Sequence, residues 1–131
     1  MMKWISALLF ALYASVSMAN CQVYVPVKEF NYAGLVIRFD FYTLFNEKGY
    51  KEVISVGEAD YELKLSDEEV IGRYFHQARA SYELIDLRSH QSKLSIVNDK
   101  RCFTQNCGIS DYRSVWVKGY KKILKTFPVC K

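Results

Sequence analysis

Four cysteines constrain the fold of this chain more than any other feature. All of them follow the first twenty residues. Four cysteines allow three pairings. We favour Cys102–Cys107, which closes a short loop, together with Cys21–Cys130, which ties the ends of one domain together. A metal site is the alternative, and its spacing is unfavourable because no second close cysteine pair exists and the histidines lie far away in sequence.

Disulfides form in oxidising compartments, and the N-terminus has the layout of a signal that leads to one. Lys3 precedes an apolar run over residues 5–13, and small residues follow up to Ala19, as in a secretory signal peptide. We expect residues 1–19 to be removed and residues 20–131 to form one periplasmic or secreted domain. The apolar run is shorter than the roughly 20 residues that a membrane span takes. No later stretch approaches that length, so we expect no transmembrane span after cleavage.

Cys21 follows the predicted cleavage site closely enough to suggest a lipid anchor. The segment 17–21 is similar to a lipobox, but Asn20 stands where a smaller residue is usual and Met18 where leucine is usual. Acylation of Cys21 would also leave one of the other three cysteines unpaired. A lipid anchor at Cys21 is therefore the disfavoured alternative.

Alternating apolar and polar residues predict an antiparallel sheet of four to five strands. The expected strands cover residues 21–27, 59–65, 74–85 and 93–97. We expect an acidic turn at 67–69 and a polar turn at 88–92. Residues 33–48 are open between strand and helix, because apolar residues alternate there while Gly49 resembles a helix cap.

The last part of the chain predicts a helix that Ser110 or Asp111 caps and Pro128 ends. Aromatic and aliphatic residues recur at helical spacing, which would pack the helix on one face of the sheet. The fold class is therefore α+β, with a C-terminal helix on an antiparallel sheet. The cations of the helix fall on its polar side: Arg113, Lys118, Lys121, Lys122 and Lys125.

These cations form a solvated helix face or a surface that binds an acidic protein or an anionic lipid. The formal net charge is only +4, and no basic-aromatic interleaving indicates nucleic acid. We therefore take the five cations as the partner-binding residues and expect no nucleic-acid partner. Exposed aromatic residues could form a second protein-binding patch. The aromatic residues considered for it are Tyr32, Tyr42, Phe75, Phe103 and Tyr112.

Catalytic and cofactor signals are weak. His76 and His90 stand in no sequence order typical of a hydrolase triad, so a hydrolase that uses His76 is disfavoured. Bridged cysteines offer no thiol nucleophile, the acidic run at 67–69 lacks calcium-loop spacing, and the glycines are isolated. We expect a protein that is not an enzyme and that has no catalytic, cofactor-binding or metal-binding residue.

Several short motifs carry a family resemblance. A strand ends in Val25-Pro26, Ala59-Asp60-Tyr61 opens another strand, and Tyr82-Glu83-Leu84-Ile85-Asp86 closes the next one. This order is similar to small bacterial envelope α+β domains, namely the TolB N-terminal domain, CsgG-like proteins and related lipoproteins. The resemblance implies one earlier helix before Gly49 on the same face of the sheet, and a scaffold or adaptor role in the cell envelope.

The expected function is that of an exported, non-enzymatic binding or adaptor protein that contacts another envelope or secreted protein. The alternative is a secreted or periplasmic inhibitor or immunity-type protein. In that alternative, the disulfide-closed loop 102–107 would be a rigid wedge with little conformational entropy to lose on binding.

Overall fold

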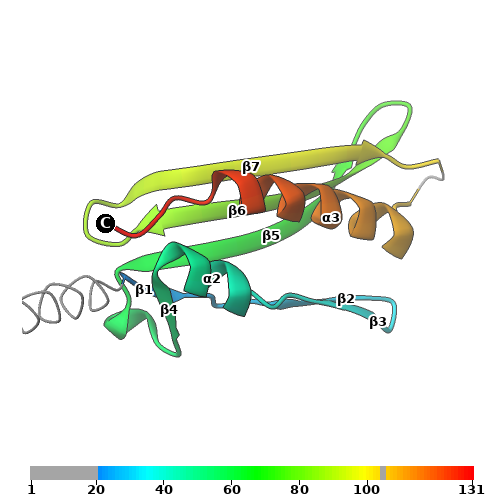
Figure 1. Ribbon diagram of the computed structural model, residues 1–131. Coiled ribbons are helices and arrows are strands. Elements are labelled where there is room, and N and C mark those ends of the chain that lie inside the picture. Colours follow the sequence, from blue (N-terminus) through cyan, green and yellow to red (C-terminus); the bar gives the residue numbers. More distant parts are fainter. Residues whose placement is uncertain (1–20, 104–105) are drawn as a thin grey trace, which may run out of the picture.

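The computed structural model describes residues 21–103 and 106–131, and its centre is a five-stranded sheet with the order β4-β1-β5-β6-β7 (Figure 1). The strands are β1 (Cys21–Tyr24), β4 (Tyr50–Val53), β5 (Tyr61–Ile71), β6 (His76–Asp86) and β7 (Gln91–Arg101). The last three form the predicted antiparallel meander. The broad α+β class is confirmed.

The prediction of a purely antiparallel sheet is wrong, because β1 pairs in parallel with both β4 and β5. Parallel strands need a crossover connection. The segment between β1 and β4 supplies it, and η1 (Val56–Glu58) lies on the way from β4 to β5. The sheet is therefore mixed.

Residues 33–48, left open by the sequence, contain both kinds of element. A two-stranded hairpin of β2 (Glu29–Tyr32) and β3 (Leu35–Arg38) precedes the helix α2 (Tyr42–Lys48). The Asp40 carboxylate accepts the Tyr42 N–H at 2.9 Å, which favours the change from strand to helix. Gly49 ends α2 in the left-handed conformation, at φ 83°.

The acidic run at 67–69 is not a turn, because β5 continues through it to Ile71 and the chain reverses only at residues 72–75. The carboxylate of Asp67 accepts a hydrogen bond from the Tyr32 hydroxyl, and that of Glu69 accepts one from the Cys107 N–H. These partners satisfy the two partly buried acids, so the strand does not have to end before them.

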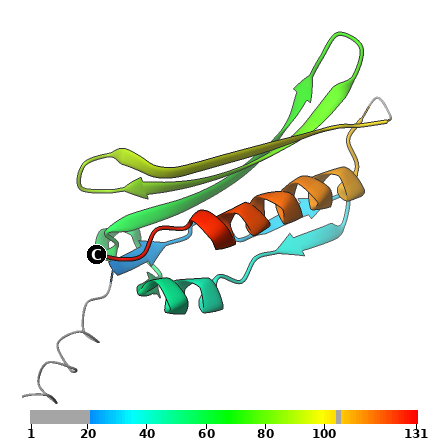
Figure 2. The same ribbon diagram turned by 45° about the horizontal axis from the view of Figure 1, so that its top comes forward.

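Helix α3 (Ile109–Thr126) packs on β6 and β7 and also lies along the β2–β3 hairpin (Figure 2). Gly108 occupies the cap position, which corrects the prediction of Ser110 or Asp111. Asp111 acts from the first turn instead, where its Oδ2 accepts the Gly108 N–H at 2.9 Å. The helix stops before Pro128 as predicted, and its buried face consists of Asp111, Tyr112, Val115, Trp116, Gly119 and Ile123.

An aromatic core joins the layers. Phe39 lies between the hairpin and the helix, with its ring 4.9 Å from that of Trp116 and 6.1 Å from that of Tyr82. Trp116 is only 1 % exposed, and its backbone carbonyl accepts the Tyr82 hydroxyl at 2.9 Å. The β2–β3 hairpin is therefore held by the core rather than projecting from it.

The structure contains both disulfides that the sequence analysis favoured, Cys21–Cys130 and Cys102–Cys107. The Cys21 sulfur is thereby bonded to Cys130 and offers no thiol for an acyl chain. The predicted signal peptide, residues 1–19, lies outside the described residues. Within the described ranges, no helix combines the length and apolar character that a bilayer crossing requires.

Candidate functional site

A hollow runs along one side of α3, and we call it the α3 groove. Its volume is about 520 Å³, and it separates the helix from strand β3 and the residues that follow that strand. The groove is lined by Ile37, Arg38, Phe39, Asp40, Arg113, Trp116, Val117, Tyr120, Lys121 and Leu124.

The helical wall of the α3 groove is apolar and open to solvent. Val117 is 47 % exposed and Leu124 is 45 % exposed, although both lie on a helix whose opposite face is buried. Ile37 and Phe39 are half-buried on the facing wall. An exposed concave surface of this composition is typical of a site that receives apolar side chains.

The charges at the rim of the groove are unbalanced. Arg113 and Lys121 are exposed, and neither forms an ion pair within the part of the chain that the structure describes. Arg38, by contrast, is neutralised by Glu29, whose carboxylate accepts its Nε–H at 2.5 Å. The only carboxylate in the lining belongs to Asp40, and it already accepts the N–H at the start of α2.

Tyr120 lines the groove and carries a neutral hydroxyl. Burial raises the pKa of Tyr120, with the nearby charges of Asp40 and Glu47 adding to the effect. The hydroxyl therefore stays protonated and donates to the backbone carbonyl of Asp40 at 3.4 Å. This contact links α3 to the residue that lies between β3 and α2.

The structure separates the five cations that the sequence grouped. Arg113 and Lys121 line the α3 groove. Lys122 lies on the other side of the helix, where its Nζ donates to Asn98 Oδ1 at 2.9 Å. Lys118 and Lys125 are exposed and do not line the groove. Arg113, Val117, Lys121 and Leu124 recur at the three- and four-residue spacing of one helix face, and Lys118, Lys122 and Lys125 recur at the same spacing on a neighbouring face.

Sequence reasoning missed the apolar wall. Val117 and Leu124 interrupt the polar side of the helix and lie three or four residues from Arg113 and Lys121, on the same helix face, and this was the available signal. The opposite wall could not be found, because it comes from the segment whose secondary structure was ambiguous.

A second polar cluster lies below the N-terminal end of α3. His76 Nδ1 lies 3.2 Å from Glu69 Oε2, and both side chains are mostly buried, with 22 % and 28 % exposure. Lys100 pairs with Asp111 at 3.4 Å in the same region. His76 is thus a histidine with a partner, whereas His90 is exposed in the turn after β6.

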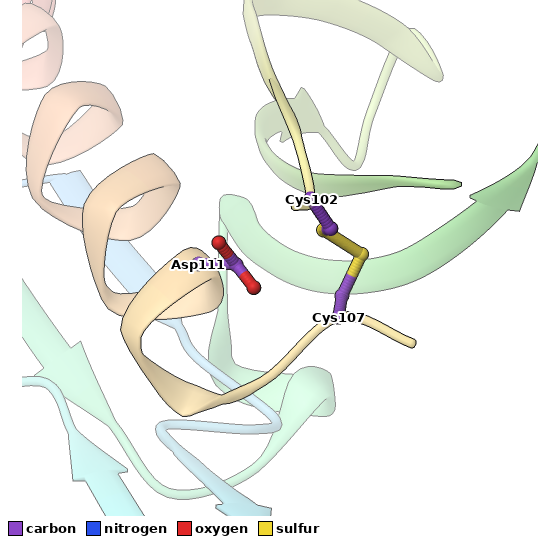
Figure 3. Close-up of side chains that lie close together, drawn as sticks. All are labelled: Cys102, Cys107 and Asp111. Carbon is purple, nitrogen blue, oxygen red and sulfur yellow. A yellow bond between two sulfur atoms is a disulfide. The ribbon is translucent and has the colours of Figure 1, made fainter. Parts of the chain in front are cut away.

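Three side chains of this region have donor atoms close enough to hold a metal ion, namely Cys102, Cys107 and Asp111, within 4.8 Å of one another (Figure 3). The geometry does not suit a metal, because the two sulfurs are bonded to each other and are not thiolates. Both Asp111 oxygens are also engaged, one by the Gly108 N–H and one by Lys100. The Asp111 carboxylate instead links the first turn of α3 to Gly108, next to Cys107, and to Lys100 in β7.

The aromatic residues considered as one patch do not form one. Tyr32 stacks on buried Tyr112 at 4.5 Å, and Phe75 lies under the Arg101 guanidinium at 3.9 Å. Only Tyr42 and Phe103 are highly exposed, at 71 % and 96 %. They do not share a surface, because Tyr42 starts α2 whereas Phe103 follows the far end of β7 (Figure 1).

Comparison with known proteins identifies no family. No family model matches the chain, and no curated protein matches it. Among solved structures, the crystal structure of protein XCC0632 from Xanthomonas campestris, assigned to DUF330, is similar over 84 % of this chain and 83 % of that chain, at 8 % identity and a TM-score of 0.31. A likeness at this level carries no argument about fold or function. The resemblance to TolB N-terminal and CsgG-like domains stays a prediction.

Proposed function

We propose that this chain is an exported, non-enzymatic binding domain that holds an acidic, apolar segment of another envelope or secreted protein in the α3 groove. The observation that carries the proposal is the groove itself. Its apolar wall remains open to solvent, and the unpaired cations Arg113 and Lys121 stand at its rim.

The partner's chemistry follows from the two parts of the groove. The exposed side chains of Val117 and Leu124 gain from burial against apolar side chains, at about 25 cal/mol per Å² of apolar surface removed from water. The rim cations favour carboxylates, which add specificity and speed of association more than affinity. The segment would therefore carry apolar residues flanked by Asp or Glu.

The size of the groove limits the length of the segment. From Arg113 to Leu124 the helix wall extends about 16 Å, at about 1.5 Å per residue. That length suits about three turns of an amphipathic helix, which is one of the common ways in which a groove recognises a peptide.

The export part of the proposal rests on the cysteines. Two disulfides in a chain of this size are typical of proteins that leave the cytoplasm. The signal-like N-terminus supports the same location, in the periplasm or outside the cell.

A peptide selection tests the function directly. We expect the oxidised protein to select, from a random peptide library displayed on phage, peptides with apolar residues next to Asp or Glu. Lys121→Glu should weaken binding of the selected peptides at least tenfold. Lys118→Glu is the matched control, because it reverses a charge on the same helix outside the groove. Selection of peptides without acidic residues, or equal losses in the two variants, would refute the proposal.

One specific observation supports the alternative function, which is inhibition of a secreted enzyme. Phe103 follows Cys102 inside the disulfide-closed loop and is 96 % exposed, as a residue that enters a partner's cleft would be. A panel of secreted hydrolases tests this function. Inhibition that disappears in Phe103→Ser and persists in Lys121→Glu would favour the inhibitor over the groove binder.

A further inference from the structure

The molecule exposes three large apolar side chains at the end where β5 meets β6 and where β7 stops. Ile71 is 76 % exposed, Tyr74 is 84 % exposed and Phe103 is 96 % exposed. Isolated exposed apolar residues need no explanation, but several of them gathered at one place mark a site of contact. We call this surface the aromatic tip and define it by Ile71, Arg73, Tyr74, Arg101 and Phe103.

Hydrogen bonds join the two chain segments of the aromatic tip into one surface. The Gly72 N–H donates to the Phe75 carbonyl at 3.1 Å and closes the turn between β5 and β6. The Cys102 N–H donates to the His76 carbonyl at 2.9 Å and holds the second segment beside the first. Tyr74 and Phe103 line the same hollow, of about 340 Å³, between them.

The charge of the aromatic tip is positive. The Arg73 guanidinium lies 5.5 Å from the centre of the Tyr74 ring, and that of Arg101 lies 3.9 Å from the Phe75 ring. The segments 71–76 and 100–103 contain no Asp or Glu. The nearest acid along β5, Glu69, is turned towards His76 and the Cys107 N–H.

The chemistry of the aromatic tip favours a bilayer surface as its partner. The turn between β5 and β6 stands away from α3 (Figure 2), and the side chains of Ile71, Tyr74 and Phe103 are each more than three-quarters exposed. Lipid phosphates complement the cations Arg73 and Arg101 beside them. A bilayer surface accepts separate projecting side chains, with tyrosine and phenylalanine rings at the level of the headgroups.

We propose that the aromatic tip docks on anionic phospholipid. Ile71, Tyr74 and Phe103 would enter the interface between headgroups and acyl chains, while Arg73 and Arg101 would contact lipid phosphates. Apolar insertion and electrostatic attraction together are what reversible membrane binding requires. This site is separate from the α3 groove, and neither proposal depends on the other.

Vesicle sedimentation tests the proposal. The probes are vesicles of phosphatidylcholine alone and vesicles of phosphatidylglycerol and phosphatidylcholine in equal parts, mixed with the exported protein with both disulfides formed. We expect sedimentation with the anionic vesicles, little with the neutral ones, and a loss of binding as salt increases. Phe103→Ser and Arg73→Glu should each lower the bound fraction at least fivefold.

The matched control is Ile54→Ser, because Ile54 is 94 % exposed but lies between β4 and η1, away from the aromatic tip. It should bind vesicles as the unchanged protein does. A Phe103→Trp variant adds a direct readout, since its fluorescence should shift to the blue on anionic vesicles. Absence of binding to anionic vesicles would overturn the proposal. So would an equal loss in Ile54→Ser, binding that only Lys121→Glu removes, or a Phe103→Ser defect confined to enzyme inhibition.

Discussion

At the scale of single residues, Gly119 sets how closely α3 approaches the sheet. A Cβ at this position would lie 2.5 Å from Tyr82 Cε2 and 3.0 Å from Asn98 Nδ2. Tyr82 is completely buried and donates its hydroxyl hydrogen bond to the helix, so its ring cannot easily give way. Glycine in the middle of this helix is therefore a requirement of packing, at the expense of helix propensity.

We predict that Gly119→Ala destabilises the protein by about 1–3 kcal/mol, the usual cost of overpacking a core. The gain in helix propensity, about 1 kcal/mol, would not offset a displaced ring. Urea denaturation measures the change. Gly57→Ala is the control, because a Cβ there meets nothing within 4 Å, and its midpoint should stay almost unchanged.

A second residue-scale prediction concerns the hydrogen-bond chain from Trp116 to Asp67. Trp116 Nε1–H donates to the Tyr32 hydroxyl at 2.8 Å, and that hydroxyl donates to the Asp67 carboxylate. Tyr32→Phe leaves the indole N–H without its partner and should cost about 1–3 kcal/mol, as for other buried donors left unsatisfied. Tyr24→Phe is the control, because Tyr24 is half-buried in β1 outside this chain. Equal unfolding midpoints for the two variants would contradict the role of Tyr32.

At the scale of elements, the two disulfides should contribute unequally to stability. Cys21–Cys130 spans 109 residues of sequence, whereas Cys102–Cys107 spans 5. In the chain-entropy description, loss of Cys21–Cys130 lowers the free energy of unfolding by about 4.8 kcal/mol, and loss of Cys102–Cys107 lowers it by about 2.2 kcal/mol. We predict a larger fall in melting temperature for Cys21→Ser/Cys130→Ser than for Cys102→Ser/Cys107→Ser. The reverse order would show that the short loop stabilises α3 by more than its closure entropy.

The secondary-structure elements differ in how well the sequence alone predicts them. The meander from β5 to β7 and helix α3 were predictable, because alternation and helical spacing extend over long segments there. The hairpin β2–β3 was not, since four-residue strands beside a seven-residue helix give each pattern too little length. The acidic run at 67–69 was misjudged for another reason. Its carboxylates are satisfied by Tyr32 and Cys107, which are distant in sequence.

The same limit applies to the α3 groove. Its cations Arg113 and Lys121 were among the residues singled out from the sequence, because charge is visible without a structure. The helical register already places them on another face than Lys118, Lys122 and Lys125, but the opposite wall that β3 builds depends on a contact between segments distant in sequence, which no local pattern predicts.

At the scale of the whole molecule, the aromatic core makes stability sensitive to alkaline pH. Burial raises the pKa of Tyr50 to about 12 from 10.0, and burial also raises the pKa of Tyr82 and Tyr32. These folded-state pKa values lie above those of the unfolded chain, so the folded protein retains protons that the unfolded chain releases. Their contribution to stability is complete below pH 10 and is lost as the pH rises towards 12 and beyond.

We therefore predict that the free energy of unfolding is level from pH 8 to about pH 10 and falls steeply above it. Urea titrations at a series of pH values measure this, and Tyr50→Phe should make the fall less steep. A stability that is independent of pH up to pH 12 would contradict the burial of these phenols.

If Arg113 and Lys121 select an acidic segment in the α3 groove, an exchange of charges between the protein and the peptide should change the affinity in a predictable direction. The measurement is calorimetric titration of a selected acidic peptide, and of the same peptide with lysine in place of its acids, into the unchanged protein and into Lys121→Glu. We expect the acidic peptide to bind the unchanged protein at least tenfold more tightly than the variant, and the lysine peptide to regain affinity on Lys121→Glu. Equal affinities in all four pairs would contradict this selection.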